Sequence, residues 1–175
     1  MIISLIGYMG SGKSLISKKL SEKINFNLLD LDKVISEQEM SEIPQIFKEK
    51  GEIYFRKREK ETLEHLLNTQ KSTVLSLGGG TPVYYNNIDT INAFSESIYL
   101  RTSVKNLHKR LIKEKSSRPL IAHIEDSDQL LEFIAKHLFE RQAYYSKAKY
   151  IVDTDDKSPD EIVNEIISLL NLHHH

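Results

Sequence analysis

Short apolar runs alternate along this chain with longer segments of helical periodicity. The first run, Ile2–Ile6, is rich in β-branched residues and breaks at Gly7, and a helical pattern follows over Lys13–Ile24. Later runs that are too short for helices lie at residues 27–31, 73–77, 97–100 and 150–152. Because short strands that alternate with helices build parallel sheets, the sequence predicts a three-layer α/β fold with helices on both faces of the sheet.

The remaining helical patterns indicate where further helices begin and end. They occupy residues 34–68, 103–114, 127–145 and 159–170. Pro44 and Gly51 interrupt the first of these patterns, so we expect several short helices there. Ser127 is the predicted N-cap of the third pattern, and Pro159 suits the first turn of the last one. Between two of the predicted helices, the polar residues 115–126 should form a loop.

The size and composition are those of one globular domain. The chain has 175 residues, of which 39% are hydrophobic and 28% charged, with only 7 Gly and 4 Pro, so it can fill a core and is not of low complexity. Without an internal repeat or a flexible linker, we expect one domain over residues 1–172. The last three histidines, residues 173–175, look like an expression tag and are excluded from the interpretation.

Charge and cysteine content exclude several classes of function. Lys and Arg number 24 against 25 Asp and Glu, a net charge of −1, so the chain has no global positive field to hold nucleic acid. The absence of cysteine excludes disulfides, thiolate nucleophiles and Cys-ligated metal sites. No apolar run approaches the roughly 18 residues of a membrane span, and no signal peptide is apparent. We therefore expect a cytoplasmic protein with small-molecule partners, monomeric by default.

The strongest functional motif lies between the first predicted strand and the first predicted helix. Residues 7–14 read Gly-Tyr-Met-Gly-Ser-Gly-Lys-Ser and match the phosphate-loop pattern G-x-x-x-x-G-K-[ST] in its required setting. In such a loop, backbone N–H groups and the helix N-terminus face phosphate oxygens, Lys13 neutralises their charge, and Ser14 can ligate Mg²⁺. The sequence therefore predicts a binding site for ATP or GTP with Mg²⁺.

Two carboxylates follow the second predicted strand. The third strand, residues 73–77, runs into glycines and lacks the acidic residue that many nucleotide hydrolases use to hold Mg²⁺. Asp30 and Asp32, two residues apart at a strand end, should project to the same side, roughly 6 to 7 Å apart. One can serve the metal while the other reaches an acceptor hydroxyl, which suits transfer to a small alcohol better than transfer to water.

Three consecutive glycines, Gly78, Gly79 and Gly80, follow the third predicted strand. They expose backbone N–H groups and let a ligand approach closely at the carboxyl edge of the sheet. We therefore interpret them as ligand-binding residues and not merely as the end of a strand.

Taken together, the motifs resemble those of the shikimate kinases in order and spacing. They are the phosphate loop, Asp30-x-Asp32, Gly51-Glu52 with Phe55-Arg56, Gly78-Gly79-Gly80, Arg118-Pro119-Leu120, and Val152-Asp153-Thr154 with Pro159. The resemblance covers the chain from Ile2 to Leu170. It implies a fold like that of nucleoside monophosphate kinases, with a parallel sheet of strand order 2-3-1-4-5 and a mobile lid near residues 115–126. The implied reaction is phosphorylation of the 3-hydroxyl of shikimate by ATP, which gives shikimate 3-phosphate and ADP on the route to chorismate and aromatic amino acids.

The resemblance also implies an acceptor site. Asp32 would bind the shikimate hydroxyls as base or orienter, and Asp30 would support Mg²⁺ near Ser14. Arg56 and Arg141 would bind the carboxylate, for which planar cationic forks are suited. From the residues alone, Arg58 would serve as well as Arg56. The implied acceptor-binding residues are Asp32, Arg56, Gly78, Gly79, Gly80 and Arg141.

For the nucleotide, the resemblance implies a set of cationic contacts. Arg118, in the loop expected to close over the nucleotide, would stabilise charge on the transferring phosphoryl group and join Asp32 and Lys13 in catalysis. Arg110 and Lys157 match positions near adenine in the family. The implied nucleotide-binding residues are Gly10, Ser11, Gly12, Lys13, Ser14, Leu15, Arg110, Arg118 and Lys157.

The sequence departs from the family pattern at two positions, and two rival functions are to be weighed. Leu15 stands where Thr is usual, and Arg101 stands where an acidic residue is common. The rivals are another small-molecule kinase of this fold, such as a gluconate or nucleotide kinase, and a non-catalytic nucleotide-binding module. The pair Arg56 and Arg141 favours an acceptor with a carboxylate, which argues against the other small-molecule kinases. Asp32 and Arg118 favour a catalytic protein, which argues against the non-catalytic module.

Overall fold

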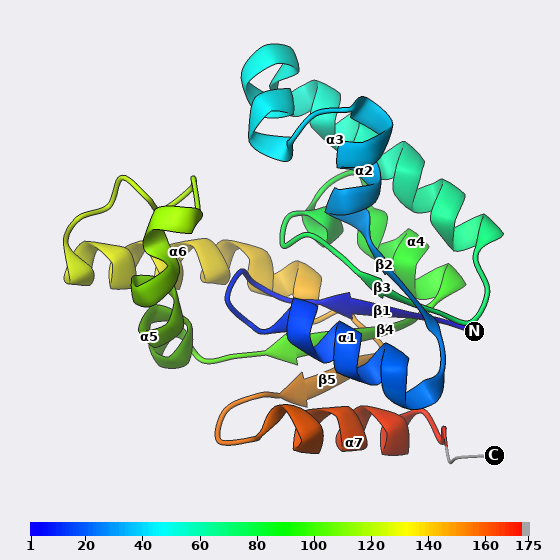
Figure 1. Ribbon diagram of the computed structural model, residues 1–175. Coiled ribbons are helices and arrows are strands. Elements are labelled where there is room, and N and C mark those ends of the chain that lie inside the picture. The colour runs from blue at the N-terminus through cyan, green and yellow to red at the C-terminus, as the bar shows by residue number, and fades with distance from the viewer. Residues whose placement is uncertain (173–175) are drawn as a thin grey trace.

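All five predicted strands form one parallel sheet in the computed structural model, which describes residues 1–172. The expected tag, residues 173–175, lies outside the described residues. The strands are β1 (Ile2–Ile6), β2 (Asn27–Asp30), β3 (Thr73–Ser76), β4 (Glu96–Arg101) and β5 (Tyr150–Asp153). Their order, β2-β3-β1-β4-β5, confirms the α/β class and the expected strand order (Figure 1).

Helices cover both faces of the sheet. They are α1 (Lys13–Ile24), α2 (Leu31–Glu39), α3 (Ile43–Thr69), α4 (Asn87–Phe94), α5 (Val104–Glu114), α6 (Ser127–Tyr145) and α7 (Pro159–Leu169). One face packs on α1 and α7 through residues such as Ile16 and Val163, and the other packs on the remaining helices. Strand side chains alternate between the two faces, so Ile3 and Leu5 point to the first core and Ile2 and Ile6 to the second.

Two details of the helices differ from the sequence-based expectation. The segment expected to hold several short helices contains α2 and the long helix α3, which is kinked at Gly51, where φ is 84°. Beyond Gly51 no Gly or Pro interrupts the apolar periodicity, so this arm continues to Thr69. The predicted cap Ser127 is wrong, because Asp126 caps α6 by accepting from the N–H groups of Asp128 and Gln129 at 2.8 and 2.9 Å.

The strand register brings distant loops to one edge of the sheet. Asp30 on β2 is level with Ser76 on β3, and Leu5 on β1 is level with both Ser76 and Ile98 on the neighbouring strands. Because the strands are parallel, the loops that follow β1, β2 and β3 meet at the carboxyl edge, where open α/β sheets bind their ligands.

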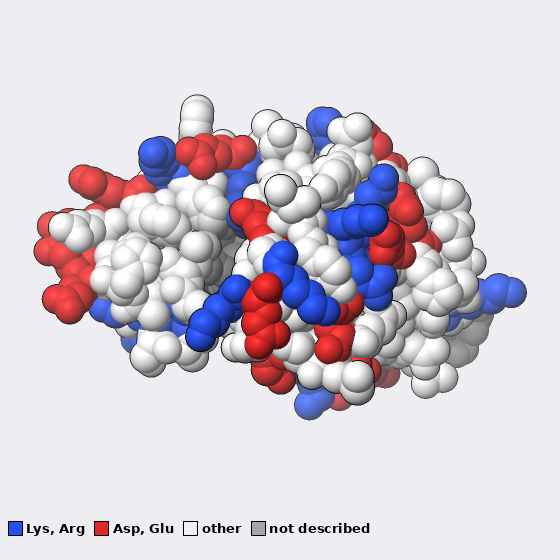
Figure 2. Space-filling model, turned by 90° about the horizontal axis from the view of Figure 1, so that it is seen from above, with Lys and Arg blue, Asp and Glu red and all other residues white. Residues whose placement is uncertain are grey.

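Charges of both signs are mixed over the face shown in Figure 2, and no broad field of one sign covers that face. This distribution agrees with the net charge of −1. Within residues 1–172, no helix combines the length and the apolar character that a membrane crossing requires.

Candidate active site

The phosphate loop joins β1 to α1, as the motif predicts. Gly10 and Gly12 have φ values of 81° and 92°, in the left-handed region that glycine adopts without strain. This backbone curls the loop around a concave surface at the N-terminus of α1. Lys13 Nζ donates to the carbonyl oxygens of Gly7 and Tyr8 at 2.7 and 3.1 Å, so its ammonium group lies over the loop.

The position of Lys13 lowers its affinity for a proton. Burial, followed by the nearby Arg118 guanidinium, lowers the pKa of Lys13 to about 8, although Asp32 and Asp30 act in the opposite direction. A partly buried cation of this kind gains from an anionic ligand, which adds to the negative charge that Asp30 and Asp32 supply.

A cavity of about 650 Å³ opens beside the loop and gathers most of the predicted site residues. Its size lies within the usual range for small-molecule sites, about 300 to 1,000 Å³. The predicted residues that line it are Gly10, Ser11, Gly12, Lys13, Ser14, Leu15, Asp30, Asp32, Gly78, Gly79, Arg110, Arg118 and Lys157. Gly80, Arg56 and Arg141 lie outside this lining, but Arg141 is next to the lining residue Gly79, and Arg56 is next to Gly80.

Asp30 and Asp32 both face the cavity, but not for the reason that the sequence suggested. They were expected to share one side of a strand end, whereas β2 ends at Asp30 and Asp32 lies in the first turn of α2. Asp30 is the N-cap of α2, and its carboxylate accepts from Lys33 N–H at 3.2 Å. The relative position of the two carboxylates is therefore set by the start of a helix, with Asp30 as its N-cap and Asp32 in its first turn, and not by the alternation of side chains along a strand.

The environment of Asp32 favours its protonated form more than bulk water does. Burial, followed by the negative charges of Asp30 and Glu59, raises its pKa to about 6, although Lys13 and Arg56 pull it down. A carboxylate with this pKa is a stronger base than an exposed one and is still ionised at neutral pH, as a general base must be.

The three glycines border side chains of the predicted acceptor site: Gly80 borders Arg56, Gly79 borders Arg141 and Gly78 borders Asp32. A Cβ on Gly80 would lie 2.7 Å from both terminal nitrogens of Arg56, and a Cβ on Gly79 would lie 3.4 Å from Arg141 Nη1. A Cβ on Gly78 would lie 3.2 Å from Asp32 Oδ1. The absence of side chains therefore lets two guanidinium groups and one carboxylate converge on this turn.

Arg56 packs beside Gly80, between an aromatic ring and a buried carboxylate. Its guanidinium carbon lies 4.2 Å from the centre of the Tyr84 ring, and its Nη1 donates to Glu59 at 2.9 Å. Glu59 also accepts from Thr81 Oγ1 at 2.7 Å. The Nε of Arg56 is buried and has no hydrogen-bond partner among the described residues, although it lies 3.5 Å from the Glu52 carboxylate. Sequence reasoning missed Glu59, although its position three residues after Arg56 on a helix was a usable signal.

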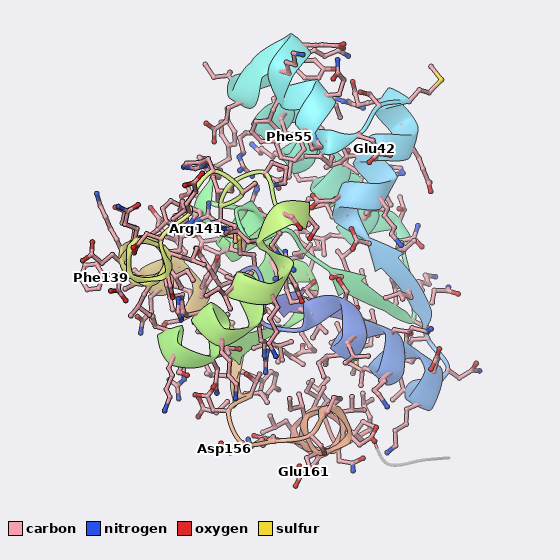
Figure 3. All side chains as sticks on the ribbon, turned by 60° about the vertical axis from the view of Figure 1, so that its left-hand side comes forward. Glu42, Phe55, Phe139, Arg141, Asp156 and Glu161 are labelled. Carbon is pink, nitrogen blue, oxygen red and sulfur yellow. The ribbon has the colours of Figure 1, made fainter. Side chains whose placement is uncertain are left out.

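Arg141 projects from α6 toward the rest of the molecule, whereas Phe139 on the same helix points outward (Figure 3). Tyr145, one turn further along α6, is fully buried and donates to the Gly79 carbonyl at 2.6 Å. This contact fixes α6 to the glycine turn and thereby locates Arg141. Tyr145 was not identified from the sequence, because its partner is distant along the chain.

A second missed contact joins α6 to the phosphate loop. The hydroxyl of Tyr8 lies 2.9 Å from His137 Nδ1. Burial and the neighbouring Arg141 lower the pKa of His137 to about 4, so the ring is neutral near pH 7 and can accept this hydrogen bond. The pair therefore links the loop to the helix that carries Arg141.

The predicted lid segment borders the cavity on one side. Arg118 pairs with Glu114 at 2.6 Å, and Ile121 and Ile124 are buried in the core. The segment is therefore attached at two apolar positions and presents Arg118 to the cavity.

The two residues assigned to the adenine side also lie at the cavity. Arg110 Nη1 donates to the Gly10 carbonyl at 3.0 Å, and Lys157 pairs with Glu165 at 2.5 Å.

The structure locates both departures from the family pattern. Leu15 is 50% exposed at the cavity wall, where its side chain faces the space for a ligand. Arg101 binds the Asp153 carboxylate with two nitrogens, at 2.5 and 2.9 Å, and so joins the ends of β4 and β5. Arg101 therefore has a structural partner outside the cavity lining.

Comparison with known proteins finds relatives along nearly the whole chain. A sequence model of the family described as "Shikimate kinase" matches residues 9–171. The shikimate kinase of Flavobacterium psychrophilum is 47% identical over 96% of this chain and 98% of its own length. The shikimate kinase of Flavobacterium johnsoniae is 44% identical over the same shares.

Solved structures agree with the sequence comparison. The shikimate kinase of Bacteroides thetaiotaomicron has a TM-score of 0.90 and 31% identity, with 98% of each chain covered. The enzyme from Acinetobacter baumannii, solved in complex with shikimate, has a TM-score of 0.83 and 30% identity, with 98% of this chain and 93% of that chain covered.

Proposed function

The chain belongs to the shikimate kinase family, and from this premise we propose which of its residues carry out each part of the reaction. That reaction is transfer of the γ-phosphoryl group of ATP to the 3-hydroxyl of shikimate, which gives shikimate 3-phosphate and ADP. Membership of this family argues against the two rival functions, a gluconate or nucleotide kinase and a non-catalytic nucleotide-binding module. The observation that carries the assignment is the single cavity that holds Lys13, Asp32 and Gly79, with two arginines beside it.

Shikimate would bind at the glycine turn. Arg56 and Arg141 offer planar donor groups for its carboxylate, and they approach Gly80 and Gly79, respectively. Gly78, on the other side of the turn, borders Asp32. A ligand that spans the turn would therefore place its acid at the arginines and its hydroxyls near Asp32.

Asp32 would orient the acceptor hydroxyl and take its proton as the phosphoryl group is transferred. Its buried position and raised pKa suit a general base at neutral pH. In phosphoryl transfer the protein contributes mainly positioning and electrostatic stabilisation, so orientation by Asp32 is as important as its basicity.

Lys13 and Arg118 would neutralise the phosphates. Lys13 lies over the phosphate loop, and Arg118 faces the same cavity from the segment over residues 115–126. Both charges border the cavity where the γ-phosphoryl group would transfer, and positive charges there would stabilise developing charge on its oxygens. We propose that residues 115–126 act as a lid, with Arg118 as its functional residue.

The residues at the loop fit Mg²⁺. Ser14 offers a hydroxyl and Asp30 a carboxylate, both at the cavity, and oxygen donors of this kind suit a hard cation that keeps phosphate and water ligands. When bound, Mg²⁺ neutralises phosphate charge and orients the β- and γ-phosphates. Asp30 is the N-cap of α2, so its carboxylate is held in place by the backbone before any ion binds.

The remaining nucleotide contacts would come from the loop backbone and the cavity wall. Gly10, Ser11 and Gly12 would cradle the phosphates, while Leu15, Arg110 and Lys157 would border the base and sugar. A single domain over residues 1–172, a monomeric state and a cytoplasmic location stay predictions from the sequence. Light scattering and cell fractionation test the last two.

A coupled assay for ADP release tests the proposal. With Mg²⁺-ATP, turnover should depend on shikimate, and quinate and gluconate serve as comparison acceptors. Variants of Asp32, Arg56 and Arg141 should lose turnover or shikimate affinity while they retain nucleotide binding. If all three variants keep the parental constants for shikimate, the proposed acceptor site is wrong.

A further inference from the structure

A cluster of charged and polar groups holds the C-terminal end of α2 against α3, outside the cavity. The carboxylate of Glu39, the last residue of α2, accepts from Lys50 Nζ, Tyr54 Oη and Arg58 Nε, each at 2.8 Å. The side chain of Glu39 is only 7% exposed, whereas the side chains of Lys50 and Arg58 are 45% and 32% exposed, so the carboxylate is shielded while its two cationic donors stay in contact with water. We call Glu39, Lys50, Tyr54 and Arg58 the Glu39 cluster.

The cluster bridges the kink in α3. Lys50 directly precedes Gly51, where φ of 84° and ψ of 169° interrupt the helix, whereas Tyr54 and Arg58 follow the kink. A Cβ on Gly51 would meet no described atom within 4 Å apart from its immediate surroundings in the chain. Across the kink, the rings of Phe47 and Phe55 pack with their centres 4.6 Å apart, and Glu39 in addition ties both arms to α2.

The elements that meet at Glu39 carry the two ends of the proposed acceptor site. Asp32 lies in the first turn of α2, and Arg56 lies between Tyr54 and Arg58 on α3. Tyr54 and Arg58 are four residues apart and share one helix face, which meets α2, while Arg56 points to another side, toward Gly80. A change in the angle between α2 and α3 would therefore change the separation of Asp32 from Arg56.

We propose that Glu39 is a positioning residue for the acceptor, which fixes the separation of Asp32 and Arg56 by holding α2 and both arms of α3 in one arrangement. This inference rests on the proposed function, because it takes Asp32 and Arg56 as the groups that bind the two ends of shikimate. Charge-assisted hydrogen bonds are shorter and stronger than neutral ones, and three of them on one carboxylate restrict the movement of all three elements. Recognition of a small rigid acid is sensitive to displacements of about 1 Å.

The charge state of Glu39 supports this role. Hydrogen bonds from Lys50 and Tyr54, and then from Arg58, hold the pKa of Glu39 down at about 2. The carboxylate is therefore ionised throughout the pH range in which the enzyme would work.

The test is Glu39→Gln. The substitution keeps the size of the side chain, but it removes the charge and turns an NH₂ group toward at least one of the three donors. We expect the KM and the calorimetric Kd for shikimate to rise about fivefold, and kcat and the KM for ATP to stay within about twofold.

Glu61→Gln is the matched control. Glu61 also pairs with Arg58, at 2.8 Å, but this contact stays within one arm of α3 and reaches neither α2 nor the kink. Glu61→Gln should therefore leave the shikimate constants unchanged. A rise equal to that in Glu39→Gln would overturn the proposal, because loss of any Arg58 partner would then explain the effect.

Tyr54→Phe tests the same idea by a smaller change. It removes one donor to Glu39 and keeps the ring, so it should fold even if Glu39→Gln does not, and it should raise the shikimate Kd about twofold. A purely structural role predicts a lower Tm with an unchanged shikimate Kd, and that result would overturn the proposal.

Arg56→Ala separates failure of this inference from failure of the proposed function. If Arg56→Ala weakens shikimate binding but Glu39→Gln and Tyr54→Phe do not, the acceptor site stands and the positioning role is wrong. If Arg56→Ala has no effect on shikimate either, the acceptor site itself is wrongly assigned, and the positioning role fails with it.

Discussion

Arg56 and Glu59 form a buried ion pair one helical turn apart on α3, with Nη1 of the arginine 2.9 Å from the carboxylate. The side chains are 12% and 1% exposed, and Thr81 is the other donor to Glu59. A buried carboxylate that loses its cation is left with an uncompensated charge, which costs about 3 to 5 kcal/mol. Arg56 therefore has a structural partner in addition to its proposed ligand.

Arg56→Ala should change two properties at once. The KM for shikimate should rise about tenfold to a hundredfold, since hydrogen bonds to charged groups contribute about 1.5 to 3 kcal/mol. The free energy of unfolding should fall by about 3 kcal/mol. The double variant Arg56→Ala/Glu59→Gln should recover much of the stability but none of the shikimate affinity. Steady-state kinetics and urea unfolding measure the two effects, with the exposed neighbour Lys57→Ala as control.

Asp32→Asn should retain nucleotide binding and lower kcat by about 10² or more, within the usual contribution of a general base. The substitution preserves shape and removes both the charge and the basic site. Single-turnover kinetics with a fluorescent ATP analogue would measure binding and chemistry separately. Undiminished turnover would remove Asp32 from the catalytic step.

Asp30→Asn should raise the Mg²⁺ concentration needed for half-maximal activity and leave the fold intact. Asn is as good an N-cap as Asp, so α2 should keep its capping hydrogen bond to Lys33 N–H. Activity titrated against Mg²⁺ at fixed ATP measures the effect, and thermal unfolding checks the cap. An unchanged Mg²⁺ requirement together with an unchanged Tm would contradict the metal role of Asp30.

His137 should make the stability depend on pH. An unperturbed histidine takes up a proton near pH 6.5, but His137 in the folded protein does so only near pH 4. Between these values the unfolded state binds more protons, so this contribution to stability is fully present above about pH 6.5 and is lost as the pH falls toward about 4.

The urea midpoint of the parent should therefore fall more between about pH 7 and pH 5 than that of His137→Gln. His65→Gln, at an exposed position on α3, serves as the control and should keep the parental slope. Equal slopes for the parent and His137→Gln would contradict the assignment.

The sequence predicted the parts of the site that depend on local patterns. The phosphate loop is a contiguous motif with a fixed setting, so its position between β1 and α1 followed directly. The strand end pointed to Asp30 and Asp32, which both line the cavity, but it predicted the wrong geometry, because the boundary between β2 and α2 falls between them. Boundaries of this kind depend on which residue caps the helix, and periodicity alone does not resolve that choice.

The contacts between elements around the site could not be predicted from the sequence. Tyr145 binds the Gly79 carbonyl and Glu39 binds both arms of α3, yet neither residue belongs to a motif. Their partners come from other elements, and only the tertiary packing decides which polar side chains meet. The resemblance to a family pointed to residues that line or border the cavity, whereas these supporting residues required the folded structure.

The position of β1 in the sheet has a consequence for how the enzyme is made. β1 is the first strand of the chain, yet it lies between β3 and β4, whose residues begin at 73 and 96. At about 5 to 20 residues per second, the ribosome needs several seconds to produce the first neighbour of this apolar strand. During that time the apolar strand has no partner in the sheet. A nascent chain that stops before β4 leaves β1 with only one of its two neighbours, so the strand that leads into the phosphate loop is incompletely paired until then.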